Sequence, residues 1–190
     1  LAADGKVYVY GFNGNGQLGI NSGANAISPQ IALKGSYAGT THLGDQVANP
    51  IIGLAASHFH SLCLAKDGTV YSFGYNGYGE LGDSTLIQRL TPVRMRKGVY
   101  SGSTYIGDDT SNPVVAIAAQ SYSSVVLTKN GRLYSLGLNN LGNLGDGTAV
   151  NRMTPVSVLK GSYGGTSFLG DSIGNPIVSI SGAEYATTAI

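Results

Sequence analysis

The chain repeats itself every 63 residues, in three copies with no insertion or deletion between them. The segment Asp4–Tyr8 returns as Asp67–Tyr71 and again as Asn130–Tyr134, and an Asn-Pro pair recurs at positions 49, 112 and 175. Tandem units of this size are typical of solenoids, propellers and arrays, in which each unit covers the apolar face of its neighbour. The period predicts one repeat region over residues 1–190, with units at 4–66, 67–129 and 130–190.

Each unit has the pattern of four short strands separated by turns. In the second half of the chain, apolar or β-branched runs at 114–118, 123–127 and 133–136 are followed by the Thr-Pro run at 154–158. An Asn-Gly pair between the second and third runs is a strong hairpin signal, because both residues tolerate positive φ. No segment sustains the period of a helix. The sequence predicts an all-β fold of four-stranded antiparallel units.

Composition narrows the classes of partner. The net charge is +1 and only 11% of residues are charged, against about 25% in an average soluble domain. The only basic run is Arg94–Lys97, so no surface that follows a phosphate backbone is expected, and nucleic acid is not a predicted partner. No apolar run approaches the roughly 20 residues of a membrane-spanning helix. This composition is common in secreted and surface proteins, which favours an extracellular or cell-surface location, with a cytoplasmic one as the alternative.

The single cysteine, Cys63, has no partner for an internal disulfide. Its equivalents in the other units are Val126 and Ala189. An unpaired cysteine that alternates with small apolar residues is typical of a buried position. We expect Cys63 to fill the core and not to react.

One long stretch resembles a known repeat. Residues Asp67–Gly82, with the following Thr91-Pro92-Val93, are similar to the repeat of the regulator of chromosome condensation family, and the first and third units match at their equivalent Gly, Asn and Leu positions. The resemblance implies four-stranded blades of a β-propeller or an open β-repeat array. In the blade phase of that family, residues 51–96 and 114–159 are whole blades and each end of the chain is a half-blade.

The chain departs from that family in two ways. An added segment of about a dozen residues stands in every unit, at 34–45, 97–108 and 160–171. Since its length is the same in every copy, we expect an ordered structure. The chain also contains no Trp, which excludes a tryptophan-based light receptor of this fold.

The added segments supply the candidate interaction residues. A tyrosine followed by a pair of hydroxyl residues recurs in each, which predicts either packing below an exposed hydroxyl-rich turn or a contact stripe for another chain or carbohydrate. O-linked glycans on the hydroxyls are a further alternative. The residues are Tyr37, Thr40, Thr41, Tyr100, Ser103, Thr104, Tyr163, Thr166 and Ser167.

No catalytic, cofactor or metal site is predicted. All three histidines, His42, His58 and His60, fall in the first unit, and a metal site would need at least three converging ligands. The recurring pair Asp45 and Asn49 could attract calcium, but a calcium ion takes six to eight oxygens and Asx capping before a proline explains the pair as well. The glycine-rich turns precede no helix, so they lack the geometry of a phosphate loop.

The leading functional prediction is a non-enzymatic structural or protein-interaction scaffold, extracellular and part of a longer or head-to-tail assembled filamentous protein. Its partners would be other copies or further repeats, another protein, or carbohydrate. The chain would end in two complementary half-blades, and heterologous pairing of such ends gives rings or filaments. The resemblance implies two alternatives, a guanine-nucleotide exchange factor-like regulator of a small GTPase and a secreted enzyme inhibitor.

Overall fold

The computed structural model describes residues 2–172 and 174–190, and within these ranges the regular structure consists of β-strands without any helix. No helix that could cross a membrane was therefore found in the described residues. The strands are β1 Tyr8–Gly11, β2 Ala26–Ile31, β3 Ile51–Ala56, β4 His60–Ala65, β5 Val70–Gly74, β6 Arg89–Arg94, β7 Val114–Ala119, β8 Ser123–Thr128, β9 Leu133–Gly137, β10 Arg152–Ser157, β11 Ile180–Gly182 and β12 Thr187–Ala189.

The strands form antiparallel meanders. Two sheets have four strands each, β3-β4-β5-β6 and β7-β8-β9-β10, and two have two strands each, β1-β2 and β11-β12. Pro92 lies in β6 and Pro155 in β10, both at sheet edges, where the missing N–H breaks no ladder. The predicted all-β fold of four-stranded antiparallel sheets is confirmed. The assignment of the whole chain to one repeat region stays a prediction.

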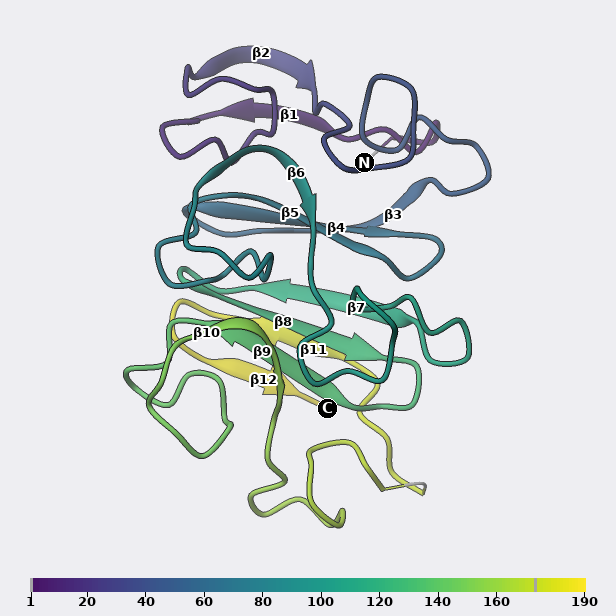
Figure 1. The fold of residues 1–190 in the computed structure, drawn as a ribbon, viewed down its shortest axis with the longest axis vertical. Coiled ribbons are helices and arrows are strands. Elements are labelled where there is room, and N and C mark those ends of the chain that lie inside the picture. The colour runs from purple at the N-terminus through teal and green to yellow at the C-terminus, as the bar shows by residue number, and fades with distance from the viewer. Residues whose placement is uncertain (1, 173) are drawn as a thin grey trace.

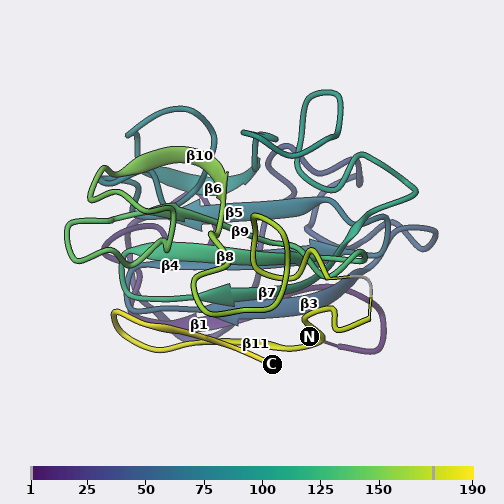
Figure 2. The ribbon, with the colours of Figure 1, turned by 90° about the horizontal axis from the view of Figure 1, so that it is seen from below.

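The sheets stack along the long axis of the molecule (Figure 1). Seen along that axis, their strands run in similar directions, so the connections gather at two ends (Figure 2). We call one of these the loop end; it carries the loops that connect β3 to β4 and β5 to β6, and their equivalents in the other sheets. The turn end carries the short turns such as β4–β5, which lies to the right in Figure 1, and the three added segments.

Apolar side chains fill the space between successive sheets. One buried cluster joins Leu62 and Val70 of the first four-stranded sheet to Val126 and Leu136 of the second. Each sheet thus covers the apolar face of its neighbour, as the repeat pattern requires. Cys63 belongs to the equivalent cluster on the other side of β4 and is 1% exposed, and burial raises the pKa of its thiol. It is a core residue, as predicted.

The added segments are ordered and link one unit to the next. In the first, a β-bridge pairs Leu33 with His42, and the N–H of Ser36 donates to the carbonyl of Pro92 in β6 at 2.8 Å. In the second, the N–H of Val99 donates to the carbonyl of Pro155 at 3.0 Å. We call this contact the clasp. It joins the added segment of one unit to the outer strand of the next sheet, whereas the apolar clusters join the sheets through their faces.

Candidate protein-interaction surface

The structure buries the tyrosines of the added segments. Tyr37 and Tyr100 are each 2% exposed, and their rings pack edge-to-face on Tyr71 and Tyr134 at centroid distances of 5.4 and 5.8 Å. Their hydroxyls donate to backbone carbonyls of the same unit, and desolvation raises the pKa of Tyr100 to about 12. Tyr163 is half-buried. The rings of Tyr37 and Tyr100 are therefore used inside the fold, and an interaction role for the three tyrosines stays a prediction.

The six hydroxyl residues beside these tyrosines are exposed, and one of each pair is used within its own loop. Thr40 donates its hydroxyl to the Asp45 carboxylate, which also accepts from the backbone N–H groups of Thr40, Thr41 and His42. Ser103 and Thr166 donate in the same way to Asp108 and Asp171. An interaction role for Thr40, Thr41, Ser103, Thr104, Thr166 and Ser167 stays a prediction.

The acidic loops are held by hydrogen bonds within each loop. Desolvation acts to raise the pKa of Asp45, but the hydrogen bonds from residues 40–42 outweigh it and lower the pKa to about 2. Asn49 points elsewhere: its side-chain amide donates to Asp67 and its oxygen accepts from the Asp67 N–H. The oxygens of Asp45 and Asn49 therefore do not converge, which agrees with capping. Among the described residues, no group of three or more His, Cys, Asp or Glu side chains could hold a metal ion.

Two of the histidines link neighbouring sheets. His60 is fully buried, with Nδ1 2.9 Å from Ser57 Oγ and Nε2 2.9 Å from Ser124 Oγ in the next sheet. Desolvation lowers the pKa of His60 to about 3, so the ring is neutral at physiological pH. His58 is exposed, and its Nδ1 lies 3.0 Å from Ser121 Oγ.

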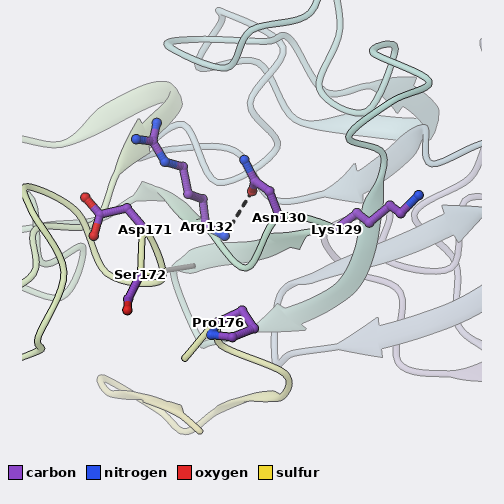
Figure 3. Close-up of a pocket in the computed structure, with 6 residues that line it drawn as sticks. All are labelled: Lys129, Asn130, Arg132, Asp171, Ser172 and Pro176. Carbon is purple, nitrogen blue, oxygen red and sulfur yellow. Dashed lines mark hydrogen bonds between the residues drawn. The ribbon is translucent and has the colours of Figure 1, made fainter. Parts of the chain in front are cut away.

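The hollow drawn in Figure 3 lies at the turn end. It is lined by Lys129, Asn130, Arg132, Asp171, Ser172 and Pro176. Lys129 extends away from Arg132, whose guanidinium lies 5.1 Å from the ring centroid of Phe168. The Asp171 carboxylate is held by its own loop. These side chains diverge, so the hollow has no arrangement suited to catalysis.

A cluster of aromatic side chains occupies the loop end instead. Phe59 comes from the β3–β4 loop, Tyr75 and Tyr78 from the β5–β6 loop, and Tyr122 from the β7–β8 loop of the next sheet. Tyr122 lies at the centre: Phe59 stacks on it at 4.9 Å, and Tyr78 meets it edge-to-face at 5.4 Å. All four rings are half-buried, so each keeps part of its surface in solvent. We call these four residues the aromatic patch.

The aromatic patch includes members of an aromatic series that recurs with the period of the repeat. Phe59 and Tyr122 are equivalent to Tyr185, and Tyr75 is equivalent to the exposed Phe12, each at an interval of 63 residues. The sequence prediction missed this series and chose Tyr37, which recurs just as regularly. The distinguishing signal was local: Phe59, Tyr122 and Tyr185 fall in the short connection between the first two strands of a sheet, where the next sheet covers them only partly.

Glu80 lies fully buried directly below the patch. Its Oε2 accepts from the N–H of Tyr78 at 2.8 Å, whereas its Oε1 has no hydrogen-bond partner in the structure. Desolvation raises the pKa of Glu80 to about 7. The equivalent residue Gln17 satisfies both ends, because its Oε1 accepts from the N–H of Asn15 and its Nε2 donates to the carbonyl of His58 in the next sheet at 3.1 Å.

Asn143, the third residue of this series, also bridges to the next sheet, because its Nδ2 donates to the carbonyl of Tyr185 at 3.2 Å. An amide at this position therefore joins neighbouring sheets, and only the carboxylate of Glu80 lacks the donor to do so.

Four-stranded antiparallel sheets that stack face to face and repeat in sequence define a β-propeller repeat protein. The model of the regulator of chromosome condensation (RCC1) repeat matches residues 4–64, 67–127 and 130–190, and a second model of the same repeat matches 51–80. The chain belongs to the regulator of chromosome condensation repeat family.

Similar proteins include large proteins with other activities. The chain is 28% identical over 86% of its length to the probable E3 ubiquitin-protein ligase HERC4 of Rattus norvegicus, of which it spans 13%. It is 30% identical over 76% of its length to the protein RCC2 homolog of Danio rerio, of which it spans 25%. The crystal structure of Prp20p from Saccharomyces cerevisiae, described with its binding to Gsp1p and histones, has a TM-score of 0.71 and 21% identity, over all of this chain and 40% of that one.

Proposed function

We propose that these repeats are a protein-binding segment of an RCC1-type β-propeller, and that the aromatic patch at the loop end is the contact surface. The observation that carries the proposal is the half-buried ring cluster of Phe59, Tyr75, Tyr78 and Tyr122, built from loops of two sheets. Aromatic residues are enriched at protein interfaces, because a tyrosine contributes apolar area, a hydroxyl and few rotamers. Loops on a rigid scaffold are where binding residues concentrate.

We propose a non-enzymatic role for this segment. The functional groups found in the described residues serve the fold: the acidic loops are capped internally and His60 is buried and neutral. The match covers only 13% of the length of the ubiquitin-protein ligase named above, so most of that ligase lies outside the matched region.

Attachment to further repeats or to other copies remains a proposal that rests on the period. The similar proteins described above lend no support to an extracellular filament or to carbohydrate binding, so we favour the cytoplasmic alternative over the predicted extracellular location.

The experiment that tests the proposal compares the two ends of the molecule. Tyr122→Ala removes the centre of the aromatic patch, and Tyr105→Ala removes a half-buried tyrosine at the turn end. Proteins retained from cell extracts by wild type should be lost from the first variant and kept by the second, with thermal unfolding showing that both variants fold. Equal retention by the two variants would contradict the proposal.

A second candidate is the exchange-factor-like regulator of a small GTPase. Similarity to Prp20p, whose structure was described with its binding to Gsp1p, favours it. The test is release of a fluorescent guanine nucleotide from small GTPases in the presence of this protein. Acceleration that disappears in Tyr122→Ala would support the candidate, and an unchanged release rate across the GTPases would reject it.

A further inference from the structure

The charged residues of the chain divide unequally between the two ends of the sheets. Nine of the eleven basic residues and six of the ten acidic ones lie at the turn end, which gives that end a formal charge of +3. Two basic and four acidic residues lie at the loop end, for a formal charge of −2, and the two ends together give the overall +1. All six lysines are at the turn end, so the end that carries the aromatic patch has no lysine.

The two basic residues at the loop end are already neutralised. Arg89 is paired with Asp83 at 2.6 Å, and Arg152 with Asp146 at 2.7 Å, each with a second hydrogen bond from the guanidinium Nε. Glu184 remains as an exposed carboxylate in the β11–β12 loop, and its carbonyl accepts from the N–H of Ser121, next to Tyr122. The field near the patch is therefore negative.

The rings of the patch also lack cationic neighbours. At the turn end, guanidinium groups lie over aromatic rings, as with Arg94 and Tyr105 at 5.2 Å. Among the described residues, no such contact involves Phe59, Tyr75, Tyr78 or Tyr122. The faces of tyrosine and phenylalanine rings attract cations, by about 0.5–1 kcal/mol where exposed and about 2 kcal/mol where desolvated. A surface of rings in a negative field thus suits a positively charged side chain.

We propose that the aromatic patch binds an arginine- or lysine-bearing segment of a partner protein, with the cationic group over the rings and Glu184 supplying the attractive field. This inference rests on the proposed protein-binding function and adds the chemistry of the partner. An acidic segment would meet like charge at this end, and an uncharged apolar segment would gain nothing from the charge division. Complementary charge of this kind also speeds association at low salt.

The test uses short Gly/Ser peptides that carry two arginines, two lysines or two glutamates, titrated into the whole chain and followed by NMR or fluorescence anisotropy. The arginine and lysine peptides should bind more tightly than the glutamate peptide, and more weakly as salt increases. Tyr78→Leu with Tyr122→Leu keeps the apolar area but removes the ring faces. It should weaken arginine-peptide binding about fivefold, the equivalent of about 1 kcal/mol.

Two further variants keep the result interpretable if the double substitution disturbs folding. Glu184→Lys changes an exposed side chain and should weaken binding of the basic peptides, whereas Tyr105→Leu at the turn end should leave it unchanged. Binding of the glutamate peptide as tight as that of the arginine peptide, or basic-peptide binding indifferent to both Glu184→Lys and the double substitution, would overturn the inference. If protein retention still depends on Tyr122 in that case, the protein-binding function stands and only the cationic partner is rejected.

Discussion

Substitution of Glu80 by glutamine should stabilise the protein, and more so at higher pH. Glu80 is fully buried with one oxygen unpaired, and its amide equivalent Gln17 donates to the carbonyl of His58 in the next sheet. The carbonyl that corresponds to that of His58, 63 residues further on, belongs to Ser121. In Glu80→Gln the new Nε2 can donate to it, while the amide oxygen accepts from the N–H of Tyr78 as Oε2 of Glu80 does.

The magnitude follows from the pKa of Glu80. Burial raises it from 4.5 to about 7, so between these values the folded state holds a proton that the unfolded state releases. The free energy of unfolding should therefore be unaffected by this group below about pH 4.5, and should fall as the pH rises from there through 7. The total loss, complete above pH 7, is about 3 kcal/mol, at about 1.4 kcal/mol for each unit of pKa difference. Glutamine has no charge to desolvate, so Glu80→Gln should remove this loss.

The assay is urea unfolding of wild type and Glu80→Gln at pH 5 and pH 8. The variant should gain on the order of 2–3 kcal/mol over wild type at pH 8 and much less at pH 5. Glu184→Gln is the matched control, because Glu184 is the only other glutamate and is exposed. It should show no comparable pH dependence. The reasoning would be refuted if Glu80→Gln changed the free energy of unfolding equally at both pH values, or destabilised the protein at pH 8.

Three smaller perturbations test the repeat geometry. Gly74 has φ of +112°, and a Cβ there would lie 2.5 Å from the carbonyl oxygen of Phe59. Gly74→Val should therefore lower the free energy of unfolding by about 1–3 kcal/mol, measured by chemical denaturation. A change of only a few tenths of a kcal/mol would contradict this. Asp108→Asn removes the carboxylate that accepts from the backbone N–H groups of residues 103–105 in the second added segment. Hydrogen exchange of these amides should therefore become faster. An unaltered exchange rate would contradict the capping role of Asp108. Tyr100→Phe keeps the ring packing and removes the hydrogen bond from the hydroxyl to the carbonyl of Asn112. The free energy of unfolding in urea should therefore fall by about 1 kcal/mol, and an unchanged midpoint would contradict this.

The fold was predictable because the information was repeated three times. A hairpin signal such as Asn130-Gly131 or a strand proline such as Pro155 is weak alone, but recurrence at 63 residues converts it into a constraint on every unit. Local geometry and the period then agree, and this consistency is what makes a sequence specify one structure.

The candidate surface was less predictable, because the period does not reveal which side of a residue is covered. Tyr37 and Phe59 belong to series that recur equally well, yet the first packs on Tyr71 and the second keeps part of its ring in solvent. The difference arises from contacts between units that are distant in sequence. The charge division was equally hidden, since it appears only when each residue is assigned to one end of its strand.

The clasp has a consequence for how such an array loses its structure. In a linear array, stability is the sum of what each unit contributes and what each junction contributes, and strong junctions make neighbouring units melt together. The N–H groups of Ser36 and Val99 attach to the outer strand of the next sheet, in addition to the apolar clusters that already join the two sheets. A junction held at both places resists hinging as well as separation. Removal of one added segment should therefore let the units on either side unfold at different denaturant concentrations, whereas the intact protein should unfold in a single transition.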